Sequence, residues 1–283
     1  FGIAPRINAA GRIEHGKRAV QLLIETNESK AKDFAEGIEN HNKERKELDQ
    51  NITKEALEMI DDSKKSTVVY SPDWHKGVVG IVASRLIENY YKPTIVLSEK
   101  DGELTGSARS VKGFNLYDAL LQCEHLLEKF GGHKYAAGLT LKKENLQTFI
   151  DEFEKVVSRT ITKDQLVAEI EVDLEIDIDE VDDKLYGIIK QFAPFGPKNR
   201  TPNFVSKNVT DCGWGKKVGE DKTHLRLVLN TSTEKITSIG FRMADDFEKI
   251  TNNKTFNICY SIDENTWNGK TSLQLRLKGI KTS

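Results

Sequence analysis

The chain has 283 residues, enough for two domains of ordinary size, and its 37% hydrophobic content supports buried cores. The formal net charge is −2, which excludes a general electrostatic attraction for nucleic acid, so any such binding requires a local basic patch. The three cysteines are widely spaced and form no Cys-x-x-Cys pair, which argues against a disulfide framework or a zinc knuckle.

Targeting and membrane signals are not evident in the sequence. No apolar run approaches the roughly 18–20 residues that span a bilayer, and no basic-then-apolar signal segment opens the chain. We therefore expect a cytoplasmic protein in a reducing compartment, without contact to a membrane. Because Phe1 lies inside what resembles a packed motif, we also expect the sequence to be part of a longer protein.

Residues 1–20 are basic and punctuated by glycine. The stretch from Gly2 to Arg12, Gly-Ile-Ala-Pro-Arg-Ile-Asn-Ala-Ala-Gly-Arg, contains two arginines, whose planar guanidinium groups match phosphate oxygens. Arg6 and Arg12 are therefore candidates for binding phosphate. The alternative is that they pair with carboxylates at a domain interface.

Residues 28–62 contain no proline and predict one long helix. Apolar or weakly polar side chains recur there with an alternating three-four spacing. These residues are Ala31, Phe34, Ile38, His41, Leu48, Ile52 and Met59. Charged residues cover the other faces, which favours a solvated connecting helix over a coiled-coil dimer.

An α/β pattern follows over residues 64–162. Short β-branched or alternating segments predict four strands, and apolar periodicity predicts three helices. The strands are Thr67–Tyr70, Thr94–Ser98, Glu103–Arg109 and Ala136–Leu141. The helices are Val78–Tyr91, Leu116–Phe130 and Glu144–Arg159. This order predicts an α/β domain with a mixed sheet.

From about residue 163 the pattern becomes mainly that of strands. A half-exposed strand is expected at Val167–Val172, a helix at Asp179–Phe192 and a short helix at Ala244–Ile250. The remaining strands are Asn203–Cys212, Thr223–Leu229, Lys235–Phe241, Phe256–Ile262 and Leu273–Lys278. Five or six strands with one interrupting helix predict an all-β Greek-key barrel of the OB type.

The segment Trp74-His75-Lys76-Gly77 lies just before an expected helix. Free backbone N–H groups and the helix dipole favour an anion at that position. His75 and Lys76 are candidates to bind it, and Trp74 is a candidate to stack on a base. The alternative is that Trp74 anchors the core and His75 caps the helix.

Two further segments of the α/β region carry candidate binding groups. Ser107 and Arg109 lie two apart in an expected strand, so both side chains point to one face and can meet one phosphate. Gly131 and Gly132 permit positive φ and close backbone approach, while His133 can donate to phosphate or transfer a proton. A glycine turn followed by a buried histidine is the alternative interpretation.

In the barrel region, Trp214, Lys216 and Lys217 place an aromatic ring beside two cations, the combination that single-strand grooves use. Other residues can extend this surface, namely Phe241, Arg242, Tyr260, Trp267, Lys270 and Arg276. The alternative is that these aromatic residues belong to the barrel core. The acidic residues 173–183 are better explained as an exposed strand of alternating charge than as a metal site, and we expect no metal site in this chain.

Three motifs together resemble the DHH-associated domain of the DHH phosphoesterase superfamily. They are Gly106-Ser107-Ala108-Arg109-Ser110, the stretch from Trp74 to Gly80, and the stretch from Gly131 to Gly138. The chain as a whole resembles the RecJ family of single-strand-specific DNA exonucleases. The match includes the entry to the OB domain at 194–204, although the family often has Gly-Asn-Pro where this chain has Lys198-Asn199-Arg200.

The resemblance implies four segments: the tail of the DHH catalytic domain at 1–27, the connecting helix at 28–63, the DHH-associated domain at 64–162 and the OB-type nucleic-acid-binding domain at 163–283. It implies that Ser107 and Arg109 line the pocket for the 5′ end of the strand. It also implies that His133 is a catalytic-site group that positions the substrate backbone, and that Arg6 meets the same groove.

The resemblance further implies the substrate-binding part of a 5′-to-3′ single-stranded-DNA exonuclease, a phosphodiester hydrolase in DNA repair and recombination. Such enzymes use two divalent metals, Mn or Mg. Without an Asp-His-His motif, this chain is expected to leave metal binding to residues outside it and to be inactive alone. Expected partners are single-stranded DNA and, among proteins, a single-strand-binding protein or helicase. The alternatives are a non-catalytic nucleic-acid-binding module, or an oligonucleotide or cyclic-dinucleotide phosphodiesterase of the same superfamily.

Overall fold

The computed structural model describes residues 2–250 and 255–282. The chain divides into two compact units, residues 1–168 and residues 169–283, and each is described by itself. Among the helices of the described residues, none is both long and apolar enough to cross a membrane.

The first unit begins with three helices. These are α1 (Ile3–Ile13), α2 (Lys17–Ile24) and α3 (Glu28–Glu58). Small and apolar side chains join them, since Ala10, Ala19 and Ile38 form a buried cluster. The side chain of Asn27 caps α3 by accepting a hydrogen bond from the N–H of Lys30, 3.1 Å away. The long helix predicted for residues 28–62 is therefore present, and it ends at Glu58.

A five-stranded mixed sheet forms the rest of this unit. Its strands are β1 (Thr67–Ser71), β2 (Thr94–Lys100), β3 (Glu103–Arg109), β4 (Lys129–His133) and β5 (Ala136–Lys142). The order is β1-β2-β3-β5-β4, with β1 and β2 parallel and the other pairs antiparallel. The mixed α/β fold expected for this region is confirmed.

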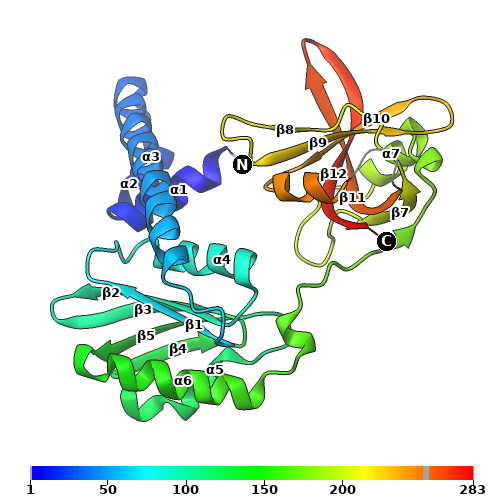
Figure 1. The fold of residues 1–283 in the computed structure, drawn as a ribbon. Coiled ribbons are helices and arrows are strands. Elements are labelled where there is room, and N and C mark those ends of the chain that lie inside the picture. The colour runs from blue at the N-terminus through cyan, green and yellow to red at the C-terminus, as the bar shows by residue number, and fades with distance from the viewer. Residues whose placement is uncertain (1, 251–254, 283) are drawn as a thin grey trace. The chain divides into compact units, whose positions relative to one another are not determined.

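Helices cover the two faces of this sheet unequally. On one face, α5 (Leu116–Gln122) and α6 (Leu146–Thr160) pack onto the sheet around Phe149 and Phe153, both fully buried. On the other face, α4 (Val79–Tyr90) packs with α3 against β1 and β2 through Val69 and Val96 (Figure 1). On the strands beyond, β5 and β4, this second face carries residues that are exposed or half-buried.

One predicted helix of this unit is wrong in its second half. The helix expected at Leu116–Phe130 ends at Gln122, a single 3₁₀ turn follows, and β4 begins at Lys129. The apolar residues Leu126, Leu127 and Phe130 still pack on the core. Their apolar spacing therefore reflects burial, although they do not form an α-helix. Gly131, Gly132 and His133 consequently lie in the edge strand of the sheet.

The second unit contains a seven-stranded mixed sheet in the order β6-β7-β11-β12-β10-β9-β8. The strands are β6 (Leu174–Glu175), β7 (Phe204–Val209), β8 (Lys216–Val218), β9 (His224–Asn230), β10 (Lys235–Gly240), β11 (Phe256–Trp267) and β12 (Lys270–Thr282). One helix, α7 (Asp183–Lys190), contributes Ile189 to the core. In the described residues no pairing joins β6 to β8, so the strands expected to form an OB-type barrel make a mixed sheet that is not closed.

Several elements of this unit differ from their predicted bounds. Val167–Val172 is not a strand, and its apolar side chains Val167, Ile170 and Val172 are exposed, because alternation without a partner strand does not fix a strand. The helix expected at Asp179–Phe192 is a 3₁₀ turn followed by α7, and the helix expected at Ala244–Ile250 is 3₁₀ over Ala244–Lys249. The three-residue strand β8 was not predicted.

Candidate nucleic-acid interface

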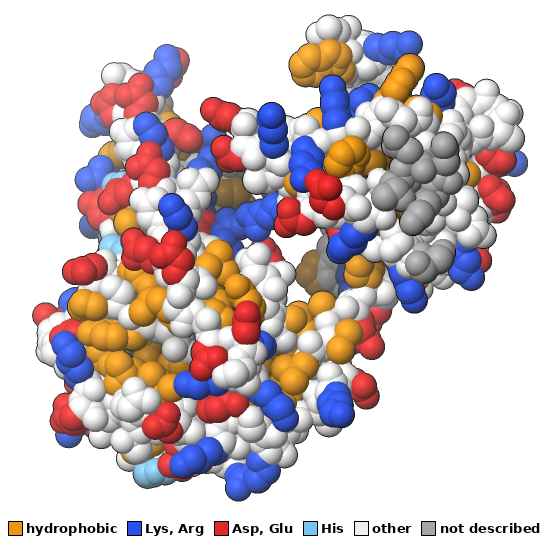
Figure 2. Space-filling view, viewed as in Figure 1, with side chains coloured by type: hydrophobic (Ala, Val, Ile, Leu, Met, Phe, Trp, Pro, Cys, Tyr) orange, Lys and Arg blue, Asp and Glu red, His pale blue; other side chains and the backbone are white. Residues whose placement is uncertain are grey.

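Lys and Arg side chains are interspersed with Asp and Glu over the visible surface of both units, as Figure 2 shows. The net charge is close to zero, and in this view no single basic face dominates the surface. A nucleic-acid site has to be found as a local group of cations that lack carboxylate partners.

Strand β3 presents such a group on the sheet face opposite to α5 and α6. Leu104 and Ala108 are fully buried in the core, so Ser107 and Arg109 project from the other face. Nη1 of Arg109 donates hydrogen bonds to Oγ of Ser107, 2.7 Å away, and to the carbonyl oxygen of Ala108, 2.9 Å away. The hydroxyl and the guanidinium therefore form one compact polar site.

Strand pairing extends this site towards the edge of the sheet. Two cross-strand rows run through β3, β5 and β4, namely Ser107–Gly138–Gly131 and Arg109–Ala136–His133. Residues of one row share a sheet face, and adjacent strands lie about 4.8 Å apart, so Arg109 and His133 are separated by about 10 Å. Glycine and alanine leave the sheet between them without large side chains. His133 is exposed at the end of β4, and its Nδ1 accepts the N–H of Tyr135 at 3.2 Å.

Gly132 is required by the geometry of this edge. A side chain there would place its Cβ 2.3 Å from the carbonyl oxygen of Ala136, and the φ of Gly132 is +154°. Gly132 thus lets the edge strand approach β5 closely, although within a strand and not in a loop, whereas a Cβ at Gly131 would meet no atom within 4 Å.

A second guanidinium lies near Arg109. Burial, and then the nearby positive charge of Arg12, hold the pKa of Arg109 below its ordinary value. Among the described residues neither arginine has a carboxylate partner, and Nη1 of Arg12 donates to the carbonyl oxygen of Gly77 at 3.2 Å. An anion between the two guanidiniums would offset their repulsion. Arg12 was noted in the sequence beside Arg6, but only the fold shows which of the two belongs here.

The first turn of α4 completes this group. A Cβ built on Gly80 would lie 3.0 Å from Nη2 of Arg109 and 3.1 Å from Oγ of Ser107. The start of the helix therefore sits directly against both side chains. Its first N–H groups have no partners within the helix and favour an anion. We call Arg12, Gly80, Ser107 and Arg109 the arginine site.

Two other predicted residues near α4 have structural contacts. Trp74 is 4% exposed, and its indole N–H donates to Oε2 of Glu55, 2.8 Å away, so the ring is an anchor of the core. Nδ1 of His75 accepts the N–H of Gly77 at 3.1 Å in the turn before the helix. Trp74 matches the structural alternative, whereas His75 does not cap α4, because the N-cap residue is Val78 and no side chain caps it. Lys76 is exposed, and no ion pair involves it within the described residues.

Arg6 is engaged elsewhere. Its Nε donates to a carboxylate oxygen of Glu39 on α3, and its Nη1 donates to the carbonyl oxygen of Gly2 at 2.7 Å. The hydrogen bond from Arg6 is the main reason that the pKa of Glu39 lies below its ordinary value. These contacts join α1 to α3, which is the carboxylate-pairing alternative.

The second unit carries a row of cations across its sheet. Registers of neighbouring strands define the cross-strand row Lys216–Arg226–Ile239–Arg276–Ser261, from β8 to β11. Its members share the face opposite to Leu225, Leu227 and Leu275, which are fully buried. Within the described part of the chain, Lys216, Arg226 and Arg276 have no carboxylate partner. We call this set the cationic row.

Exposed aromatic rings flank the cationic row. Trp214 is 62% exposed, with Nζ of Lys235 4.3 Å from its ring centroid. Phe241 is half exposed, and the Arg276 guanidinium lies 5.2 Å from its ring centroid. Exposed rings beside cations suit stacking on bases and contact with phosphates.

Other residues suggested for this surface have different surroundings. Tyr260 is fully buried, burial raises its pKa to about 12, and its hydroxyl lies 2.8 Å from Oγ of Ser206, so it belongs to the core. Lys217 is paired with Glu248 at 2.9 Å. Trp267 and Lys270 are exposed at the turn between β11 and β12.

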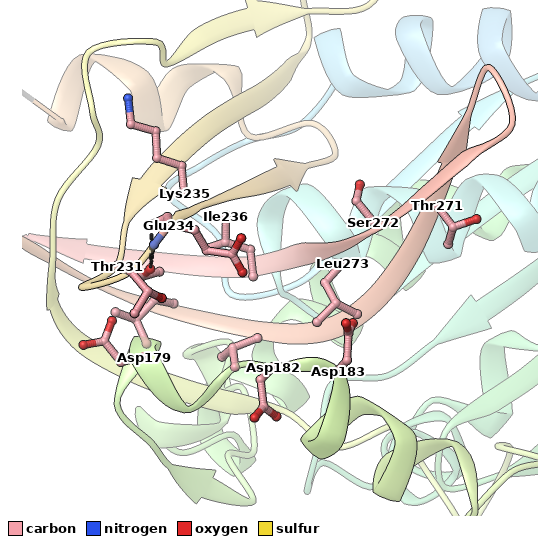
Figure 3. Close-up of a pocket in the computed structure, with 13 residues that line it drawn as sticks. Asp179, Asp182, Asp183, Thr231, Glu234, Lys235, Ile236, Thr271, Ser272 and Leu273 are labelled. Carbon is pink, nitrogen blue, oxygen red and sulfur yellow. Dashed lines mark hydrogen bonds between the residues drawn. The ribbon is translucent and has the colours of Figure 1, made fainter.

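A separate pocket of about 360 Å³ in the second unit is acidic (Figure 3). Asp179, Asp182, Asp183 and Glu234 are among its lining residues. Two of these carboxylates already accept backbone N–H groups, Asp179 from Ser232 and Asp182 from Leu185, both at 2.7 Å. Over residues 2–250 and 255–282 no group of three or more His, Cys, Asp or Glu is arranged to hold a metal ion. The negative lining also opposes a phosphate.

Comparisons with known proteins agree with this architecture. Residues 63–159 match the DHHA1 domain, and residues 172–279 match the RecJ OB domain. The single-stranded-DNA-specific exonuclease RecJ of Bacillus subtilis is 34% identical over 100% of this chain and 36% of its own length. RecJ of Haemophilus influenzae is 30% identical over 99% of this chain and 51% of its own length. The chain thus spans about a third to a half of these relatives.

Solved structures give the same fold. RecJ of Thermus thermophilus in complex with Mn²⁺ matches with a TM-score of 0.85 and 24% identity, over 100% of this chain and 41% of that one. The same protein in complex with Mg²⁺ matches with a TM-score of 0.83, also at 24% identity, over 100% of this chain and 43% of that one. A DHHA1 domain followed by an OB domain defines the class of this protein. More particularly, the chain contains a RecJ OB domain and is similar over its whole length to RecJ proteins, as its sequence motifs suggested.

Proposed function

We propose that this chain is the substrate-binding part of a 5′-to-3′ single-stranded-DNA exonuclease of the RecJ type. One observation carries the proposal. Arg109 donates to the Ser107 hydroxyl against the start of α4, and Arg12 donates to the Gly77 carbonyl oxygen just before that helix, and within the described residues neither guanidinium has a carboxylate partner. This combination of charge, donors and helix dipole is suited to a phosphate group.

In this proposal the arginine site holds the 5′-terminal phosphate of the strand. The exposed Gly131 and the half-buried Ala136 leave room for the sugar-phosphate backbone along the sheet. His133, about 10 Å from Arg109 across two strands, then faces the next part of the backbone as a positioning group. Arg6 and His75 remain secondary candidates, because both have protein partners in this structure.

The second unit would bind nucleotides further along the strand. The cationic row supplies charges for phosphates, and Trp214 and Phe241 supply exposed rings for bases. OB domains use this mixture of stacking and charge for single strands without strong sequence preference. Lys216 and Trp214 are the predicted members of this surface, and Arg226 is a member that the sequence did not single out.

Hydrolysis by the whole protein would need divalent metal ions, which activate water and hold the leaving oxygen. The related structures contain Mn²⁺ or Mg²⁺, and we propose that residues outside this chain hold the metal. The proposal extends to a cytoplasmic role in DNA repair and recombination, with a single-strand-binding protein or a helicase as protein partners.

The test is binding of oligo(dT) with either a 5′-phosphate or a 5′-hydroxyl, measured by fluorescence anisotropy at low salt. Arg12→Gln should weaken binding of the phosphorylated strand by about tenfold or more, since a charge-assisted contact contributes roughly 1.5–3 kcal/mol. The hydroxyl form should bind almost unchanged. Lys155→Ala is the matched control, because it removes one exposed cation from α6 on the opposite face of the sheet. Equal losses on both strands would refute recognition of the 5′ end.

A further inference from the structure

The second unit has a groove of about 610 Å³ next to the cationic row. It runs beside β11 beyond Tyr260, where the pairing of β11 with β7 ends. The lining residues are Tyr186, Ile189, Lys190, Ala193, Phe195, Arg200, Thr201, Asn203, Ser261, Ile262, Asp263, Arg276 and Lys278. The groove is thus formed by α7, the segment that follows it, and the free edge of β11 with the neighbouring β12.

The floor of the groove holds a hydroxyl group that can bind a ligand. Ser261 is 5% exposed, and within the described residues its hydroxyl has no hydrogen-bond partner. Ser261 is also the last member of the cationic row, directly opposite Arg276 in the register of β11 and β12. A polar atom of a ligand in the groove can form a hydrogen bond with this hydroxyl without displacing a protein partner.

The rim of the groove is positively charged at the end next to the cationic row. Arg276 and Lys278 lie two apart on β12, and among the described residues neither has a carboxylate partner. Burial and the Arg276 guanidinium hold the pKa of Lys278 below its ordinary value. Two unpaired cations at this rim match a phosphate.

The other charges of the groove are largely balanced. Lys190 pairs with Glu264 at 3.1 Å, and Arg200 pairs with Glu171. Asp263 also lines the groove, and its carboxylate accepts the N–H of Glu264 at 2.9 Å. The carboxylate of Asp263 and the hydroxyl of Ser261, inside the groove, match the polar edge of a base. The cations at the rim match a phosphate.

An aromatic wall is held in place by the segment after α7. Gly196 and Asn199 exchange two backbone hydrogen bonds of 2.8 and 3.0 Å, which close a tight turn directly after Phe195. The Asn199 side chain donates to the carbonyl oxygens of Phe192 and Pro194, at 2.8 and 3.0 Å. These bonds fix the backbone on both sides of Phe195, whose side chain is 36% exposed and lines the groove. Tyr186 also lines the groove, and Nζ of Lys190 lies 5.2 Å from its ring centroid.

We propose that this groove binds one nucleotide of single-stranded DNA, with its base on Phe195 and its phosphate at Arg276 and Lys278. This inference rests on the proposed function, because it continues the cationic row by one further position. Arg276 belongs to the cationic row and also lines the groove. A DNA strand that lies on the row can therefore continue into the groove while its phosphates stay next to positive side chains. An acidic peptide is the competing occupant, but it would leave the polar floor at Ser261 and Asp263 poorly matched.

The test uses the whole chain and oligo(dT) of about 4 and about 16 nucleotides, which bracket the site sizes of OB domains. Phe195→Ala should weaken binding of the longer strand about fivefold or more, in line with the loss of one stacked base. The shorter strand should bind nearly as before, because it can stay on the cationic row. Phe192→Ala is the matched control, since this ring is 62% exposed in the same segment but does not line the groove.

Ser261→Ala gives an independent second variant. It removes a hydroxyl that has no protein partner, so the thermal midpoint should not fall, while affinity for the longer strand should fall about twofold to tenfold. A normal melting curve for each variant shows that the fold is intact.

The outcomes separate the two proposals. If the unmodified chain binds neither strand at low salt, the proposed function and this inference are both wrong. A second case is that the unmodified chain binds both strands. If the variants Phe195→Ala and Ser261→Ala then bind with the same affinity as the unmodified chain, only the assignment of the groove as a nucleotide site is wrong. An oligoglutamate peptide provides the last comparison. If the peptide binds the unmodified chain, loses affinity in Phe195→Ala and does not displace DNA, the groove binds an acidic peptide and the nucleotide assignment fails.

Discussion

Arg12 and Gly77 contact each other through both their backbones and a side chain. Nη1 of Arg12 donates to the Gly77 carbonyl oxygen at 3.2 Å, and the Arg12 carbonyl oxygen lies 2.0 Å from where a Gly77 Cβ would be. The end of α1 is thereby fixed against the turn that leads into α4. This contact brings the Arg12 guanidinium close enough to Arg109 to lower the pKa of Arg109.

Gly77→Ala should therefore destabilise the first unit by about 2–3 kcal/mol, because the added methyl group would force α1 away from the turn. Gly187→Ala is the matched control, since no atom lies within 4 Å of a Cβ at Gly187 in α7. Removing glycine from an exposed helix should stabilise slightly, by about 0.5–1 kcal/mol. Denaturant unfolding monitored by circular dichroism measures both, and a neutral Gly77→Ala would mean that the contact with α1 is not formed.

Glu154 makes stability depend on pH. Burial raises its pKa, but hydrogen bonds from Ser158, from Ser66 and from the N–H of Lys65 outweigh this effect, and the pKa lies below its ordinary value. A lowered pKa contributes stability above the pKa of the unfolded chain, roughly 4.3, and that contribution is lost as pH falls through the folded-state value.

Glu154→Gln should thus lower the free energy of unfolding most at neutral pH. The difference from the unmodified chain should shrink as pH falls below about 4.3. Glu144→Gln serves as the control, because Glu144 is exposed and has no hydrogen-bond or ion-pair partner in the described residues. Urea unfolding at several pH values checks the prediction, which fails if the difference stays constant with pH.

The local sequence pattern was sufficient to predict features that depend on a single helix or strand. The common face of Ser107 and Arg109 follows from strand alternation alone, and the seam of α3 follows from helical periodicity. Partnerships between distant segments were not predictable in this way. The pairing of Arg6 with Glu39, the proximity of Arg12 to Arg109 and the row that joins Lys216 to Arg226 depend on packing and strand register.

The edge strand β4 shows a second limit of local pattern. Apolar spacing at Leu126, Leu127 and Phe130 extended the predicted helix to Phe130, directly before Gly131 and Gly132, which disfavour a helix. The paired strand β5 decides the outcome, because it supplies backbone partners from Lys129 to His133. The pairing of β4 with β5 therefore determined the structure of this segment, although the apolar spacing before the two glycines was that of a helix.

Lys198 offers a test of backbone strain in the segment that positions Phe195. Its φ is +68°, a conformation that costs a non-glycine residue roughly 1–2 kcal/mol. Lys198→Gly should relieve this strain and, after the greater flexibility of glycine in the unfolded chain is subtracted, stabilise the second unit by about 0.5 kcal/mol. Lys184→Gly, in the ordinary helical conformation of α7, should instead destabilise by about 1 kcal/mol. Thermal unfolding distinguishes the opposite signs.

Arg109→Ala and Trp214→Ala should weaken DNA binding in different ways. Arg109 and Ser107 share one face and can meet the same phosphate, so its loss removes roughly 1.5–3 kcal/mol, or about ten- to a hundredfold in affinity. One stacked base at Trp214 contributes a similar 1–3 kcal/mol or so, but Phe241 and the cationic row can partly replace it.

The two effects should also depend on different features of the strand. Arg12 is the other cation in the arginine site, but it donates to the Gly77 carbonyl oxygen and cannot restore the contacts of Arg109 with Ser107 and Ala108. The loss in Arg109→Ala should therefore appear with a 5′-phosphate and nearly vanish with a 5′-hydroxyl. The loss in Trp214→Ala should be the same for both termini and should grow with strand length, because a longer strand covers the cationic row and the Trp214 ring together. Dissociation constants for both variants on both termini and two lengths decide the matter. If Arg109→Ala loses equally on both termini, Arg109 has a structural role in packing β3 against α4 and does not recognise the strand end.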